Sequence, residues 1–208
     1  MVQELNDSAG KRTLVGLTGT FGSGKSAVTA IFENLGAFTL NADEIAHEAL
    51  LPGTEVFSYI EETYPGVIVN GGVDRKKLAA EVFSDHKKKN ELESRIHPYV
   101  FEQIRERVSK SSQKLVVLEV PLLFETGYER QCDVTVCVTA NPDIIRERLK
   151  AKGFGTDEIE ARNRAQLEAS EKEEKADFII DNSASLNETV TQVKEILSKI
   201  KKNSKGVS

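Results

Sequence analysis

A complete G-x-x-x-x-G-K-S phosphate loop occupies Gly19–Ser26. The apolar run Leu14–Leu17 precedes the loop and a helix-patterned segment follows it, which is the strand–loop–helix context that this motif requires. Glycines let the backbone curl around phosphate groups without a Cβ in the way, and the following helix presents its positive end to the anion. The motif therefore predicts a strand-to-helix turn that binds ATP or GTP.

The predicted nucleotide contacts come from this loop and from the first turn of the helix. Lys25 can place a point charge at the β- and γ-phosphates, and the Ser26 hydroxyl can ligate Mg²⁺, so we expect Mg²⁺ as the cofactor. The alternative interpretation is a glycine-rich turn whose lysine is solvated. The residues expected to bind ATP here are Gly22, Ser23, Gly24, Lys25, Ser26 and Ala27.

Composition excludes several classes of protein. The chain has 208 residues and a formal net charge of −5, so nothing in its charge predicts a nucleic-acid surface. The polar segment 1–12 lacks the apolar region of a signal peptide, and no stretch approaches the length of a membrane span, so we expect a cytoplasmic protein without a membrane partner. Cys132 and Cys137 lack metal-binding spacing and are expected to be core or half-buried thiols.

Short apolar runs alternate with helical patterns along the chain. This order predicts an α/β fold of the P-loop NTP hydrolase type, three-layer α/β/α with a five-stranded parallel sheet, in which the second strand lies next to the phosphate-loop strand. A last helix is expected at 186–200. The predicted strands are 14–18, 37–40, 115–120, 134–138 and 178–180.

Polar residues end several of these runs, where ligands of parallel sheets bind. Asp43 follows the second strand, where it can accept a proton from an acceptor hydroxyl or, equally well, cap a helix over 44–50. Glu119 ends the third strand and can help to hold a metal ion. Asp181 and Asn182 follow the fifth strand at the same edge.

The long interval 44–114 is mainly helical and opens at this ligand edge, so it is a candidate acceptor-binding insertion. A turn is expected at 69–72. Asp74 is expected to cap a helix over 75–83, and Pro98 is expected in the first turn of another helix, directly after His97.

The segment 150–175 is highly charged and contains glycines at 153 and 155, which is typical of a lid that closes over phosphates. Arg148, Lys152 and Arg162 are candidates for neutralising charge during phosphoryl transfer. The alternative for each is a cation on a solvated face.

Several stretches together resemble the dephospho-CoA kinase family. The likeness covers 13–200, and the combination of the phosphate loop with His-Pro and Pro-Leu-Leu-Phe-Glu in this order is specific. The stretches that carry it are Leu17–Ser26, Ala42–Ala46, Asp74–Leu78, Val82-Phe83, His97-Pro98, Val120–Glu125, Arg162 with Gln166, and Ile180–Asn182.

The resemblance implies ATP-dependent phosphorylation of the ribose 3′-hydroxyl of dephospho-CoA, with ATP and dephospho-CoA as partners and a monomer or small homo-oligomer as the assembly. It implies that Asp43, with Lys25 and Arg162, is catalytic, that Arg75 and His97 bind the acceptor beside Asp43, and that Asp181 and Asn182 lie at the adenine end of ATP.

The implied organisation has three parts between a flexible extension and a tail. A nucleotide-binding core, a helical acceptor-binding domain and a lid make up a kinase domain over 13–200. The core is 13–43, 115–149 and 176–200, the acceptor-binding domain is 44–114, the lid is 150–175, the extension is 1–12 and the tail is 201–208.

The chain departs from the family pattern at three positions, where Asn41, His47 and Lys152 replace an aspartate and two arginines. Another small-molecule kinase is the nearest alternative function. A regulatory GTPase needs D-x-x-G and N-K-x-D motifs after the phosphate loop, and they are absent from the sequence there. A non-catalytic nucleotide-binding protein is the third alternative.

Overall fold

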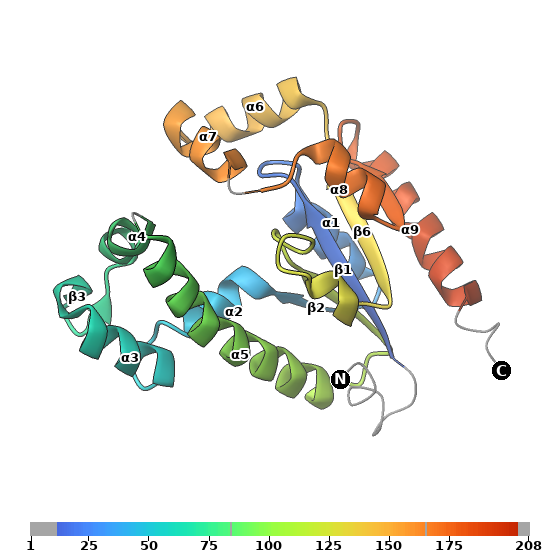
Figure 1. Ribbon diagram of the computed structural model, residues 1–208. Helices are drawn as coiled ribbons and strands as arrows, with labels where there is room; N and C mark the ends of the chain where they lie inside the picture. The colour runs from blue at the N-terminus through green and yellow to red at the C-terminus, as the bar shows by residue number, and fades with distance from the viewer. Residues whose placement is uncertain (1–11, 84, 165, 204–208) are drawn as a thin grey trace. The chain divides into compact units, whose positions relative to one another are not determined.

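The computed structural model describes residues 12–83, 85–164 and 166–203 (Figure 1). Their contacts divide the chain into two compact units. The core unit comprises the described residues of 1–40 and 111–208, and the helical unit is Asn41–Lys110.

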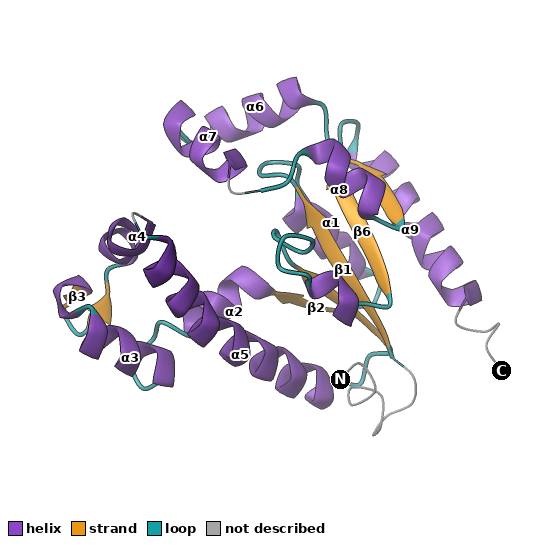
Figure 2. Ribbon diagram, viewed as in Figure 1, coloured by secondary structure: helices purple, strands orange, loops and turns teal. Residues whose placement is uncertain are grey.

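A five-stranded sheet organises the core unit, in the order β2-β5-β1-β6-β7 (Figure 2). The pairs β1–β5, β1–β6 and β6–β7 are parallel, and Leu17 pairs with Glu119 on one side and with Val136 on the other. The predicted α/β class and the five strands are confirmed, each strand within about one residue of its expected ends. The strands are β1 Thr13–Gly19, β2 Phe38–Asn41, β5 Leu115–Glu119, β6 Val134–Thr139 and β7 Phe178–Asp181.

The expected neighbour of the phosphate-loop strand was wrong, because β5 separates β2 from β1. β5 is almost wholly buried, whereas β2 has four residues of which only Leu40 is buried. A short, half-buried strand suits the edge of a sheet, and a fully apolar one suits the centre. Strands that follow each other in the chain often pair, but in this sheet the more buried β5, and not β2, lies next to β1.

Helices cover both faces of this sheet. Alternate β1 residues point to opposite faces: Val15 and Leu17 join the core cluster formed with α1 and α9, whereas Gly16 faces Leu123 and Cys132 in the connection after β5. Figure 1 shows α8 on the face opposite α1. The core-unit helices are α1 Lys25–Asn34, η3 Tyr128–Gln131, α6 Pro142–Ala151, α7 Thr156–Arg164, α8 Ala169–Lys175 and α9 Leu186–Asn203.

The helical unit packs its helices around a small core of its own, with Val56, Ile60, Leu78 and Leu92 at its centre. The expected turn is a tight hairpin in which Asn70 and Gly71 both have positive φ, 52° and 77°. The elements are α2 Ala42–Glu48, α3 Glu55–Thr63, η2 Pro65–Val67, β3 Ile68–Val69, β4 Gly72–Val73, α4 Arg75–Phe83 and α5 His86–Lys110.

Two predicted helix starts have different outcomes. Asp74 caps α4 as expected, because its Oδ1 accepts the backbone N–H groups of Lys76 and Lys77. Pro98 does not start a helix but lies inside α5, which Asp85 caps instead. A proline in a helix interior costs about 3 kcal/mol, and α5 offsets this by burying Leu92, Val100, Ile104 and Val108 along its length.

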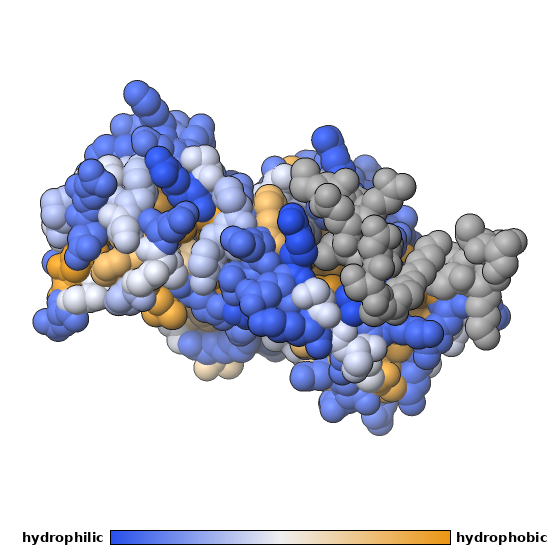
Figure 3. Space-filling view, turned by 90° about the horizontal axis from the view of Figure 1, so that it is seen from below, coloured by the Kyte–Doolittle hydropathy of each residue, from blue (hydrophilic) through white to orange (hydrophobic). Residues whose placement is uncertain are grey.

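The space-filling view is mostly hydrophilic, with small separate hydrophobic areas (Figure 3). Within the described residues, no helix combines the length and the apolar character that a membrane span needs.

Candidate active site

The phosphate loop joins the carboxyl end of β1 to the first residue of α1, so its backbone curls at the ligand edge of the sheet. Gly19 and Gly24 have positive φ, 146° and 96°. A Cβ at Gly19 would lie 2.2 Å from the Val138 carbonyl oxygen, and one at Gly24 would lie 2.1 Å from Asn182 Nδ2. Both positions therefore admit only glycine, and the loop keeps the tight curve that phosphate binding needs.

Lys25 lies inside this curve. Its side chain is buried, and its Nζ donates to the carbonyl oxygens of Gly19 at 3.0 Å and Thr20 at 3.1 Å. The ammonium group is thereby held against the backbone that encloses the predicted phosphate position. Its charge adds to the positive end of α1, which starts at Lys25 itself.

A carboxylate and two hydroxyls meet beside the loop. Glu119 is buried at the end of β5, and it accepts from Thr29 Oγ1 at 2.8 Å and from Ser26 Oγ at 3.4 Å. Hard oxygen donors of this kind suit Mg²⁺, which takes one or two protein ligands and fills its remaining positions with phosphate and water. The described residues hold no cluster of three or more His, Cys, Asp or Glu side chains.

Thr29 was not singled out from the sequence. It lies three residues after Ser26, so both hydroxyls face the same side of α1. A hydroxyl residue three positions after Ser26, together with a glutamate at the end of a strand, is the sequence pattern from which this set of oxygen atoms could have been predicted.

Asn182 supports the loop from behind. Its Nδ2 donates to the Ser23 carbonyl oxygen at 2.9 Å, and its Oδ1 accepts from Thr189 at 3.0 Å. Arg148 donates to Ser23 O at 3.4 Å and to Asn182 O at 2.8 Å. The neighbouring Asp181 is exposed instead, and its carboxylate accepts the Ser183 N–H. The two residues expected together at the adenine end thus have different surroundings.

We expect Asn182→Ala to weaken ATP binding and to lower the free energy of unfolding by about 1–3 kcal/mol, because it removes the buried hydrogen bonds of Asn182 to Ser23 O and Thr189 Oγ1 and leaves those atoms only the longer contacts with Arg148 and Ser185. Calorimetric titration with ATP and urea unfolding measure the two effects. Asn187→Ala, on the exposed side of α9, is the matched control and should leave both unchanged. Equal effects of the two substitutions would contradict the supporting role of Asn182.

The three candidate cations are not equivalent. Arg148 donates hydrogen bonds to the carbonyl oxygens behind the loop, as described above. Lys152 is exposed at the end of α6. Arg162 in α7 stacks on the Phe21 ring of the loop, with 4.5 Å between its Cζ and the ring centroid. Its guanidinium also pairs with Glu158 at 3.0 Å. Among these three candidates, Arg162 is therefore the cation that stacks on a side chain of the phosphate loop.

Asp43 belongs to the helical unit, two residues beyond the end of β2. The helix that contains it, α2, begins at Ala42, and its cap is Asn41, whose Oδ1 accepts the N–H groups of Asp43 at 2.9 Å and Glu44 at 3.3 Å. The alternative interpretation of Asp43 as the cap was wrong, because the helix starts two residues earlier than expected. The exposed Asp43 carboxylate is not needed for that role.

His47, one turn after Asp43 on α2, lies within the electrostatic range of both Asp43 and Arg75. Burial, and then the charge of Arg75, lower the pKa of His47 below its ordinary 6.5, while Asp43 and Glu44 raise it. The lowered pKa favours the neutral imidazole at pH 7, so His47 lacks the permanent charge of an arginine. His97 lies on α5, with its ring 6.1 Å from that of Phe101.

Comparison with known proteins decides the family. A family model described as Dephospho-CoA kinase matches residues 13–188. The chain belongs to the dephospho-CoA kinase family. The matched range extends over the phosphate loop and the positions of Asp43, Arg162 and Asn182.

Relatives that are described as dephospho-CoA kinases align with most of this chain. The dephospho-CoA kinase of Nitrobacter winogradskyi is 39% identical over 188 residues, which are 88% of this chain and 94% of that protein. The one from Aquifex aeolicus is 37% identical over 186 residues, with the same coverage. The crystal structure of TT1252 from Thermus thermophilus, 34% identical, superposes with a TM-score of 0.84 over 91% of this chain and 98% of that one.

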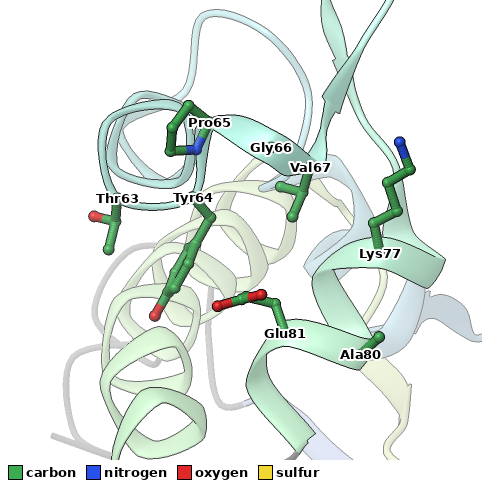
Figure 4. Close-up of a pocket in the computed structure, with 8 residues that line it drawn as sticks. All are labelled: Thr63, Tyr64, Pro65, Gly66, Val67, Lys77, Ala80 and Glu81. Carbon is green, nitrogen blue, oxygen red and sulfur yellow. The ribbon is translucent and has the colours of Figure 1, made fainter.

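The helical unit also has a pocket of about 510 Å³. In Figure 4 the Glu81 side chain extends toward the Tyr64 ring. Neither Arg75 nor His97, the family-implied acceptor residues, is among its lining residues, so this pocket does not coincide with the predicted acceptor side. The lining residues are Thr63, Tyr64, Pro65, Gly66, Val67, Lys77, Ala80 and Glu81.

Proposed function

We propose that this member of the dephospho-CoA kinase family transfers the γ-phosphoryl group of ATP to the ribose 3′-hydroxyl of dephospho-CoA, giving CoA and ADP. This is the last step of CoA biosynthesis. The observation that carries the proposal is the family match over 13–188, which contains an intact phosphate loop with its buried lysine.

In the proposed mechanism the loop does the binding. Backbone N–H groups of Gly22–Ser26 and the start of α1 hold the phosphates, and Lys25 exchanges its contacts with Gly19 and Thr20 for the β- and γ-phosphate oxygens. The Ser26 hydroxyl, with Glu119 behind it, would hold Mg²⁺. When bound, Mg²⁺ supplies charge neutralisation at the β- and γ-phosphates.

Asp43 is the proposed base. An ionised carboxylate can orient the acceptor hydroxyl and take its proton as the phosphoryl group moves. Arg162 is proposed to neutralise charge on the moving group, since a guanidinium matches the geometry of phosphate oxygens. Asp181 is proposed to lie at the adenine end.

The wider organisation follows from the same proposal. Residues 44–114 bind the acceptor, with Arg75 and His97 on its contact side, and 150–175 serve as the lid. We propose a cytoplasmic monomer or small homo-oligomer with no nucleic-acid or membrane partner.

The test is ADP release by the purified chain with ATP, Mg²⁺ and one acceptor at a time: dephospho-CoA, AMP, CMP, adenosine or gluconate. We expect turnover only with dephospho-CoA, with CoA as the product by chromatography and mass. Turnover with another acceptor alone would leave the phosphate loop in its role and overturn the substrate. ATP binding without turnover would favour a binding protein.

A further inference from the structure

Two aromatic rings from separate segments contact the guanidinium of Arg162, whose side chain is 49% exposed. Phe21 belongs to the phosphate loop, and Phe154 lies in the turn between α6 and α7. The rings meet edge to face, with 5.0 Å between centroids and an interplanar angle of 83°. Arg162 Cζ lies 4.5 Å from the Phe21 centroid and 5.3 Å from the Phe154 centroid. We call these two rings the aromatic clamp.

The clamp connects α7 to the loop. None of the α7 residues is fully buried, and Ile159 is only half-buried, so apolar packing holds this helix weakly. Beside the clamp there is a cavity of about 370 Å³, lined by Thr20 and Phe21 from the loop and by Ile159 and Asn163 from α7, among others. This cavity therefore lies between α7 and the loop, and the stacking of Arg162 on the two rings connects the helix to the loop beside it.

Stacking leaves the guanidinium able to bind phosphate. A cation–π contact uses the flat face of the group, whereas its five N–H donors lie in its plane. One donor contacts Glu158, four residues earlier on the exposed side of α7. Glu158 and Arg162 are both exposed, and an ion pair between exposed side chains is weak. A phosphate oxygen can therefore replace the Glu158 carboxylate while Arg162 stays stacked on the rings.

Phe21 is attached to the part of the loop that would hold the nucleotide. Its neighbour Thr20 accepts from Lys25 Nζ, and Gly22 follows directly. A cation stacked on Phe21 is thus positioned relative to the loop backbone rather than relative to the lid. Phe21 occupies one of the four variable positions of G-x-x-x-x-G-K-S, so the motif itself does not require this ring.

We propose that Phe21 and Phe154 are positioning residues that hold Arg162 beside the phosphate loop for phosphoryl transfer. The inference rests on the proposed catalytic role of Arg162. The clamp orients the guanidinium before the nucleotide arrives, and the orientation matters most when charge moves onto the transferred phosphoryl group.

The test is a double-mutant cycle on kcat for dephospho-CoA phosphorylation. Phe21→Leu and Phe154→Leu remove the ring faces at similar volume, and each is expected to lower kcat about two- to fivefold with little change in KM for ATP, the size of an exposed cation–π contact. Phe154→Tyr keeps a ring face and should retain the original kcat. In an Arg162→Ala background, the two leucine variants should cause no further loss.

Arg164→Ala is the matched control, because Arg164 is exposed at the end of the same helix and pairs with Glu160. Its kcat should equal that of the original chain. Leucine variants that lower kcat equally with and without Arg162 would overturn the clamp and leave the proposed function intact. An Arg162→Ala variant with full kcat would overturn both the clamp and the catalytic role of Arg162. Absence of turnover by the original chain would instead contradict the proposed function.

Discussion

Asp43→Asn is expected to lower kcat for dephospho-CoA phosphorylation by about 10²- to 10⁴-fold, the contribution of a positioned general base. An amide has the shape of the carboxylate but cannot take the hydroxyl proton. ATP affinity should change little, because the predicted phosphate contacts come from Gly22–Ser26 and not from α2. Stability should also be nearly unchanged, because Asn41 rather than Asp43 caps α2 and the carboxylate is exposed.

Single-turnover kinetics with saturating ATP and dephospho-CoA measure the chemical step, and equilibrium titration measures ATP binding. Glu44→Gln is the matched control, since Glu44 is also exposed, also in the first turn of α2 and also near His47. It should retain kcat within about threefold, as expected of a surface change. If Asp43→Asn kept a comparable rate, the base would have to be another group.

Patterns within single elements predicted much of the fold. The five strands are apolar runs whose limits a short sequence window determines, and the chain order of strands and helices indicated the α/β class. The position of β2 at the edge depends on which strand buries more surface in the finished sheet, and a window around β2 does not contain that information. Pro98 inside α5 is a similar case, because packing of residues on both sides of the proline outweighs its local preference.

The candidate site divides in the same way. Glycines, Lys25 and Ser26 are consecutive, so a motif describes them, and the structure gives the loop the curvature that the motif predicts. The supports of the loop come from distant segments: Asn182 lies 159 residues from its partner Ser23, and Arg148 lies 125 residues away. Such contacts exist only after the sheet has formed. The Phe21–Arg162 stack has the same origin.

Lys172→Met is expected to lower the free energy of unfolding by about 3–5 kcal/mol, the usual cost of removing one partner of a buried ion pair. The Lys172 side chain is 0% exposed, and its Nζ lies 2.9 Å from Glu125 Oε1 and donates to the Pro121 carbonyl oxygen at 2.6 Å. Without the ammonium, the Glu125 carboxylate keeps the Leu167 N–H as a donor, while its Oε2 is already buried without a hydrogen bond. An uncompensated buried charge is then left behind.

Urea or thermal unfolding measures this loss, and for a chain of this size about 3 kcal/mol corresponds to roughly 6–12 °C in Tm. Lys175→Met, exposed in the same helix, is the matched control and should change Tm little. The double variant Glu125→Gln with Lys172→Met removes both charges and should lose less than the sum of the single variants. Strict additivity would mean that the two charges do not stabilise each other.

The same pair joins segments that the proposed reaction needs together. Pro121 O accepts from Lys172 and also from the Thr18 hydroxyl, one residue before the phosphate loop begins. Glu125 accepts the Leu167 N–H between α7 and α8. A Lys172→Met enzyme that is still folded at 25 °C should therefore lose kcat as well, because α7 carries Arg162 and is anchored at this end. Unchanged kcat alongside a lower Tm would restrict Lys172 to a structural role and leave the positioning of Arg162 to the clamp alone.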